Sequence, residues 1–268
     1  MGGTNPKIKV KDAQQRLWIV KWAEEINSET FASRLAAALG FFARPTFFLK
    51  EGRIEGVRGL RRAGPHVEDD GTFRSAAFKM ISDDMPYLAG ANWAWTDNPF
   101  LETEQGRRHL NGLKIVVMLT SNWDAKDARD VRQGVNTAIY RATGGDRTVR
   151  LLYAMDDWGA SMGRWGNAFT REKWDCPGYE DQTPDFVKGV DDGLVQWGFT
   201  GKNAKDVTEG VTVEDVRWLL QYLSGIKDQQ IEAALKSSGA DAEEVTCFSR
   251  AIRERIRQLQ EVAGLSRP

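Results

Sequence analysis

The order of hydrophobic patterns along the chain limits its fold more than any single motif does. Residues 7–22 alternate apolar and polar side chains around a polar turn, which predicts a β-hairpin. Residues 29–39 carry apolar side chains at helical spacing, with Ser28 as the expected N-cap and Gly40 as the expected stop. Further strands are predicted at residues 41–49 and 53–82. The first part of the chain is therefore expected to be β-rich with one helix.

The rest of the chain has a different hydrophobic pattern, with mainly helical periodicity and irregular segments. An irregular segment rich in Trp, Asn and Asp leads to residues 102–120, which predict an amphipathic helix. A polar stretch and then a hairpin of residues 137–140 and 149–155 follow, and residues 156–210 show little periodicity. Helices are predicted near the C-terminal end at residues 212–223, with Thr212 as N-cap, 228–236 and 241–262. A β-rich part followed by a helical part predicts an α+β fold.

Composition excludes several kinds of partner. The 37 basic and 38 acidic residues give a net charge of −1, so neither nucleic acid nor an anionic membrane surface is expected as a partner. The sequence contains no run of about 18 apolar residues, so no transmembrane helix is expected, and no signal peptide is recognisable. The chain as it stands is expected to be cytoplasmic. Its abrupt start at Met1-Gly2-Gly3 leaves export open, because a leader could have preceded it.

The few cysteines and histidines restrict the chemistry. Cys176 and Cys247 are expected to be two buried thiols, with a single disulfide as the alternative. His66 and His109 are the only histidines, which argues against a histidine-rich zinc site. The chain also has 10 Trp residues, most of them expected in the core.

Two charged residues near the beginning form a predicted pair. Lys21 ends the second predicted strand, and alternation places it on the same face as Ile19. A lysine on an apolar face needs a partner, and Glu29 on the following helix is the natural one. The alternative is a lysine at a strand end in contact with solvent.

Two aspartates follow at positions suited to phosphoryl transfer. Asp124 lies in the polar loop after the long helix, where a carboxylate could position an acceptor hydroxyl. Asp157 begins Asp157-Trp158-Gly159 directly after the predicted hairpin, and a strand ending in Asp-aromatic-Gly is typical of a magnesium-binding loop. The N-terminal Gly2-Gly3-Thr4 could cover phosphates with its backbone N–H groups, with a flexible terminus as the alternative.

Taken together, these motifs resemble the HipA-type serine kinases and their atypical protein- and lipid-kinase relatives, in a bacterial branch of that group. The resemblance covers residues 1–160. It rests on five features: the N-terminal loop ending in Pro6-Lys7, the strand lysine Lys21, Glu29 with Arg34-Leu35-Ala36 five residues later, Asn122-Trp123-Asp124, and Asp157.

The resemblance implies an ATP- and Mg²⁺-dependent kinase with a two-lobed protein-kinase-like fold. The β-rich N-lobe would span residues 1–85 and the helical C-lobe residues 86–268. The acceptor would be a hydroxyl, with serine or threonine of a protein favoured and a glycan as the alternative.

The same resemblance assigns roles to single residues. Asp124 would accept the acceptor's proton, Asp157 would hold magnesium, and Lys21 would contact phosphates while paired with Glu29. The phosphate-covering residues would be Gly2, Gly3, Thr4 and Lys7.

One departure from the pattern concerns the second metal ligand. The family has an asparagine five residues after the catalytic aspartate, and here Arg129 occupies that position. Asn136, directly before the predicted hairpin, could take the role, and Asp127 is the weaker substitute. Arg129 therefore favours, as the first alternative, a pseudokinase that binds nucleotide or acts as a scaffold. The second alternative is a metal-dependent phosphohydrolase built on Asp124, Asp127, Asp156 and Asp157.

Overall fold

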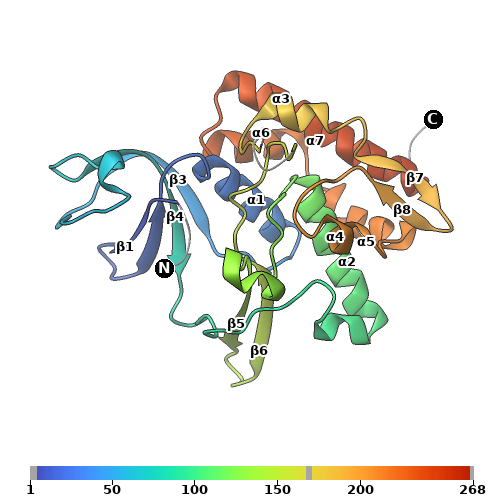
Figure 1. Ribbon diagram of the computed structural model, residues 1–268, viewed down its shortest axis with the longest axis horizontal. Coiled ribbons are helices and arrows are strands. Elements are labelled where there is room, and N and C mark those ends of the chain that lie inside the picture. Colours follow the sequence, from blue (N-terminus) through green and yellow to red (C-terminus); the bar gives the residue numbers. More distant parts are fainter. Residues whose placement is uncertain (1–4, 167–170, 266–268) are drawn as a thin grey trace.

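The computed structural model describes residues 5–166 and 171–265. Its N-terminal part is a four-stranded antiparallel sheet with strand order β1-β2-β4-β3 and one helix, α1. The bounds are β1 Lys7–Lys11, β2 Leu17–Lys21, α1 Ile26–Ala38, β3 Thr46–Arg53 and β4 Thr72–Ile81. Figure 1 shows α1 between this sheet and the C-terminal helices, and α1 contacts β3, β4 and α6 (Asp228–Ser237). The predicted β-rich part with one helix is confirmed.

The two faces of the sheet have different chemistry. Val20 pairs with Phe78 across β2 and β4, and both belong to an apolar cluster on the face away from α1. Ile19 pairs with Lys79, and Lys21 pairs with Ala77, so both lysines are on the opposite face, toward α1. Strand alternation thus delivers two lysines to the side of the sheet that α1 covers.

The boundaries of the N-terminal elements differ from the predictions. Helix α1 begins at Ile26 with Glu25 as N-cap, so Ser28 is not the cap. Its hydroxyl instead donates to the Gly159 carbonyl oxygen at 2.8 Å. Gly40 ends the helix as predicted, with a φ of +86° that favours glycine. Strand β3 begins at Thr46 and not at residue 41.

The later part of the chain is mainly helical. Helix α2 (Glu104–Leu119) lies at its centre and contacts α4 and α5, and α7 packs against α3, α5 and α6. A hairpin of β5 (Thr137–Thr143) and β6 (Val149–Met155) lies apart from these helices (Figure 1). The remaining elements are η1 Gly64–His66, η2 Pro99–Glu102, η3 Ala128–Gln133, α3 Cys176–Asp181, α4 Ala204–Thr208, α5 Val213–Leu223 and α7 Ala242–Val262. Among the described residues, no helix has the length and apolar character needed to cross a bilayer.

A second hairpin, of β7 (Val187–Asp191) and β8 (Leu194–Trp197), lies in the stretch where no element was predicted. Asp192 and Gly193 both have positive φ, of 46° and 75°. An Asp-Gly pair with two positive φ values is the preferred two-residue turn of a hairpin. The turn signal was therefore present in the sequence, but the strands were too short to show a clear period.

Two tryptophans of the irregular segment form part of the core. Trp93 and Trp95 are 3% and 1% exposed, and their rings pack edge to face at 4.7 Å. Neither ring can therefore offer a flat surface to a sugar. Core packing, the interpretation favoured from the sequence, is confirmed for this pair.

The prediction of two buried thiols is wrong, because Cys176 and Cys247 form a disulfide. The two residues are 71 positions apart, and helix–helix packing of α3 on α7 brings their Cα atoms to 6.2 Å. This separation could not be read from the sequence, since it depends on which helices pack together.

Arg255 on α7 is the main polar anchor of the helical part. It is 1% exposed, although it interrupts the apolar stripe of its helix. Its guanidinium lies 3.7 Å from the Tyr179 ring centroid. It donates hydrogen bonds to Met118 O, Leu119 O, Ser121 Oγ, Tyr179 O and Thr183 Oγ1. Because Met118 and Leu119 end α2, Arg255 adds a buried donor to the last carbonyl groups of this helix, directly before the loop that holds Asp124.

We expect removal of the disulfide to lower stability without changing the fold. Joining residues 71 positions apart restricts the unfolded chain, so Cys176→Ser with Cys247→Ser should lower the free energy of unfolding by about 2–4 kcal/mol. Urea denaturation measures this change. Dithiothreitol should reproduce it in the wild type and leave the double variant unaffected. A wild-type curve that is insensitive to reductant would contradict the disulfide.

We expect Arg255→Met to lower the free energy of unfolding by about 3–5 kcal/mol, because the buried hydrogen bonds that join α7 to the end of α2 and to α3 are lost together. Arg257→Met is the matched control, since the Arg257 side chain is 53% exposed and its ion pairs within the described part of the chain are with Glu254 and Glu261 on its own helix. Its effect should stay below about 1 kcal/mol. Equal effects of the two substitutions in urea denaturation would refute the anchoring role of Arg255.

Candidate active site

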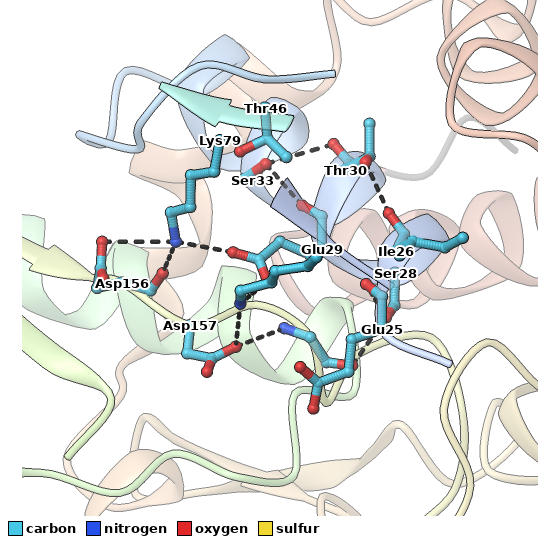
Figure 2. A network of polar contacts seen from close by, with 12 residues as sticks. Glu25, Ile26, Ser28, Glu29, Thr30, Ser33, Thr46, Lys79, Asp156 and Asp157 are labelled. Carbon is cyan, nitrogen blue, oxygen red and sulfur yellow. Dashed lines mark hydrogen bonds and ion pairs between the residues drawn. The ribbon is translucent and has the colours of Figure 1, made fainter. Parts of the chain in front are cut away.

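The site is built around Glu29, which is fully buried on α1. Its Oε2 accepts a hydrogen bond from Lys21 of β2, and its Oε1 accepts one from Lys79 of β4 at 2.7 Å. Figure 2 shows Glu29 reaching from α1 toward Lys79, Asp156 and Asp157. The predicted pair of Lys21 and Glu29 thus exists, and Lys79 is a third member that was not predicted. Lys79 interrupts the apolar run 76–81, which is the signal that could have identified it.

Lys21 remains charged in this buried setting. Burial lowers the pKa of its ammonium group, but the nearby carboxylates of Asp157, Glu29 and Glu25 raise it further than burial lowers it. The net pKa is above the usual value of a lysine. Lys21 is therefore a permanent positive charge on the inner face of the sheet.

Asp157 faces this charge from the opposite side. Its Oδ1 lies 3.7 Å from Lys21 Nζ and accepts a hydrogen bond from the Gly159 backbone N–H at 3.0 Å. Burial raises the pKa of the carboxyl group, but Lys21 and Lys79 lower it, and the result is a pKa of about 2. The side chain is still 40% exposed. Asp157 is thus an anion with an accessible side available to a ligand.

The neighbouring carboxylate of Asp156 is, in contrast, bound by side chains of the protein on both oxygens. Arg44 binds both carboxylate oxygens, at 3.0 and 2.8 Å, and the Tyr140 hydroxyl donates to Oδ1 at 2.7 Å. Lys79 Nζ lies 3.5 Å from the same Oδ1. Burial opposes ionisation, yet Lys79 and Arg44 hold the pKa of Asp156 well below its usual range. Asp156 is occupied on both oxygens and ties the end of β6 to the sheet.

Asp124 lies in the loop after α2, next to two lysines. Its Oδ2 accepts a hydrogen bond from Asn136 Nδ2 at 3.1 Å and is 3.1 Å from Lys126 Nζ. Its Oδ1 is 3.5 Å from Lys202 Nζ. Oδ1 is buried and accepts no hydrogen bond from any part of the chain that the structure describes.

The loop of Asp124 is bound directly to the loop of Asp157. The Asn122 side chain donates to the Asp157 carbonyl oxygen at 3.1 Å, and the Trp123 N–H donates to Ala160 O at 3.2 Å. The Asn122 Oδ1 in turn accepts from the Asp124 N–H at 3.3 Å. The two predicted aspartates are therefore placed by one hydrogen-bonded unit.

The two candidates for the second metal ligand differ clearly. Asn136 donates from Nδ2 to Asp124 O and Oδ2, so its amide oxygen is the atom left for a cation. Asp127 is fully buried, caps η3, and accepts from Arg129 and from the Trp95 N–H at 3.1 Å. Burial raises the pKa of Asp127, but the hydrogen bonds from Arg129 lower it below its usual value. Its oxygens are thus occupied by protein groups, and Asn136 is the stronger candidate.

A group of carboxylates near Lys21 could bind a cation. Glu25, Glu29 and Asp157 have oxygens within 4.8 Å of one another. Glu25 binds Lys173 through Oε1 at 2.5 Å, and its buried Oε2 has no hydrogen-bond partner within residues 5–166 and 171–265. A Cβ at Gly159 would lie 2.7 Å from the Glu25 carboxylate, so a larger residue there would displace the Glu25 side chain. Carboxylate oxygens are the ligands that Mg²⁺ prefers.

The predicted phosphate loop is described only at its end. Gly2, Gly3 and Thr4 lie outside the described residues. Lys7 begins β1 and is the cross-strand partner of Lys21. Burial and the charge of Lys21 together lower the pKa of Lys7. The N-terminal segment therefore enters the sheet beside Lys21, the lysine that was predicted to contact phosphates.

Similarity to known proteins is found among solved structures only. No protein-family model and no curated protein matches the sequence. The crystal structure of a Helicobacter pylori proinflammatory kinase, CtkA, matches with a TM-score of 0.55 and 14% identity, over 98% of this chain and 92% of that chain. A HipA chain from Shewanella oneidensis MR-1, in complex with HipB and operator DNA, matches with a TM-score of 0.39 and 11% identity, over 99% of this chain and 66% of that chain.

At such identities, a structural likeness shows the fold alone. The likeness to CtkA extends over nearly the whole of both chains, sheet and helical part included. The motifs that predicted this fold occupy its sheet, its central loop and the end of its hairpin. The chain therefore shares the fold of the kinase CtkA.

Proposed function

We propose that this chain is a kinase that binds ATP with Mg²⁺ and transfers the γ-phosphoryl group to a hydroxyl, with serine or threonine of a protein as the favoured acceptor. Residues 1–85 and 86–268 would act as the two lobes that enclose the nucleotide. The observation that carries the proposal is the Lys21–Glu29 pair facing Asp157, with Asp124 attached to the same loop through Asn122. Phosphoryl transfer requires little more than such an arrangement of fixed charges.

The proposed role of each residue follows from its charge and from whether its polar atoms already have a hydrogen-bond partner. Lys21 carries a permanent positive charge and would neutralise phosphate oxygens, with Glu29 holding it in place. Lys7 and the N-terminal residues Gly2, Gly3 and Thr4 would cover the phosphates. Asp124 presents a buried oxygen without a hydrogen bond, which suits an incoming hydroxyl.

The donor chemistry fits magnesium. Asp157 and Asn136 would hold the ion, and the unpartnered Glu25 Oε2 belongs to the same carboxylate group as Asp157. When bound, magnesium would neutralise charge on the terminal phosphates.

The transfer step can be written on the chain's own residues. The acceptor oxygen forms a bond to the γ-phosphorus as the bond from that phosphorus to the β–γ bridging oxygen breaks. The electron pair leaves with ADP, and the hydroxyl proton passes to Asp124. Lys21 stabilises negative charge on the phosphates throughout.

A pseudokinase is the second candidate, and Arg129 favours it. Arg129 occupies the expected metal-ligand position and binds Asp127 at 2.5 Å and Asp206 at 2.6 Å. The phosphohydrolase alternative has less support, because Asp127 and Asp156 are each bound by arginine and not open to a second metal. A pseudokinase would bind nucleotide without turning it over, or would not bind it.

We expect ATP with Mg²⁺ to raise the thermal stability of the chain, by about 2.7 kcal/mol at a hundredfold excess over the dissociation constant. Asp157→Ala should abolish the magnesium-dependent part of the shift, while Asp84→Ala, at an exposed position, should leave it unchanged. Labelled γ-phosphate should then appear on an acceptor or in solution. No shift with any nucleotide would reject the proposed activity, and a shift without transfer would favour the pseudokinase.

Substitutions at the buried pair should separate folding from nucleotide binding. Glu29→Ala removes the carboxylate that both buried ammonium groups share and leaves them the longer ion pairs with Asp156 and Asp157, so we expect a loss of about 3–5 kcal/mol in the free energy of unfolding. Lys21→Met leaves Glu29 bound to Lys79 and should cost less stability than Glu29→Ala, yet it should weaken the response to ATP. Urea denaturation and thermal shift measure the two effects. Equal stability losses in the two variants would contradict the shared role of Lys79.

A further inference from the structure

The segment Gly201-Lys202-Asn203 is built against the loop that holds Asp124. The Lys202 N–H donates to Trp123 O at 2.8 Å, and Lys202 forms a parallel bridge with Asp124. A Cβ at Gly201 would lie 2.7 Å from the Trp123 carbonyl oxygen, so only glycine fits this approach. The Asn203 side chain donates to Ala125 O at 3.2 Å. The segment is therefore held in a fixed position relative to Asp124, although it lies more than seventy positions later in the sequence.

The side chain of Lys202 completes the surroundings of the carboxylate. Its Nζ lies 3.5 Å from Asp124 Oδ1 and donates to Gln133 Oε1 at 3.2 Å. Lys126 lies at the other oxygen, 3.1 Å from Oδ2, and donates to Gln133 O at 3.1 Å. Each oxygen of Asp124 thus has its own ammonium group, and both ammonium groups are bound to the same residue, Gln133.

This arrangement fixes the plane of the carboxylate. The last torsion of an aspartate has a broad energy profile, so contacts at one oxygen alone leave the other free to rotate. Asn136 and Lys126 hold Oδ2, and Lys202 attracts Oδ1. At 3.5 Å the Lys202 contact is an ion pair and not a hydrogen bond, and Oδ1 therefore keeps its lone pairs for another donor.

We propose that Lys202 is a positioning residue for phosphoryl transfer, which keeps Asp124 Oδ1 turned toward the acceptor hydroxyl. The inference rests on the proposed function. The acceptor O–H donates to Oδ1, its oxygen attacks the γ-phosphorus, and its proton passes to Asp124 as ADP leaves with the electron pair of the broken bond. Lys202 acts through Asp124 and needs no contact with ATP.

The test compares Lys202→Met and Lys202→Arg with Lys205→Met. Lys205 is a matched control, because its side chain is 80% exposed and, among the described residues, forms an ion pair only with Glu209, one helical turn away. The assay is phosphate release from Mg²⁺-ATP with water as acceptor, together with the thermal shift produced by the same nucleotide. We expect Lys202→Met to lower kcat about 10- to 100-fold, since misplacing a reacting group by about 1 Å has an effect of that size.

The separation of kcat from KM distinguishes positioning from a merely structural role. Lys202→Met should leave KM for ATP and the thermal shift unchanged, Lys202→Arg should recover part of kcat, and Lys205→Met should behave as wild type. If Lys202→Met fails to fold, Lys202→Gln, which keeps a polar tip, takes its place. A wild-type or raised kcat in these variants, or a change in KM alone, would overturn the assignment. A wild-type chain with no shift and no turnover would overturn the proposed function itself, and this inference with it.

Discussion

The buried carboxylate of Glu29 is the interaction on which the rest of the site depends. Removing an ion from water costs several kcal/mol unless charges and hydrogen bonds compensate. Glu29 meets this requirement with Lys21 and Lys79, one from each of two neighbouring strands. The pairing sets the position of α1 against the sheet. Lys79 also donates to the Asp156 carbonyl oxygen, so the same charge cluster places the end of β6 and hence Asp157.

The aspartates of the site fall into two classes according to how they are held. Asp156 and Asp127 each form an ion pair with an arginine and accept further hydrogen bonds, so their oxygens serve to join segments of the chain. Asp124 has a buried oxygen that accepts no hydrogen bond from the described residues, and the Asp157 side chain is 40% exposed, although lysines lie close to both. A catalytic carboxylate has to remain ionised and still have room for a ligand. Asp157 meets both conditions, with a pKa of about 2 and a side chain that is 40% exposed.

A second buried ion, the guanidinium of Arg255, supports the site from the C-terminal helices. Arg255 joins α7 to the end of α2 and to α3, and the loop that carries Asp124 begins where α2 ends. Asn122 then ties that loop to the Asp157 segment. The C-terminal helices, for which no chemistry was predicted, therefore fix the point at which the loop that carries Asp124 begins. Their disulfide between α3 and α7 strengthens the same contact.

The sequence by itself determined the order of elements outside residues 156–210, the pairing of Lys21 with Glu29, and the places of Asp124 after the long helix and Asp157 after the hairpin. These features depend on local periodicity and on residues with few ways to be satisfied, so they could be predicted. Lys79 and Lys202, the disulfide and the occupied state of Asp127 were decided only by the tertiary structure. Each of these depends on segments far apart in the sequence, and composition or spacing does not encode which of them meet. A buried charge demands a partner, but only the packed chain selects which residue supplies it.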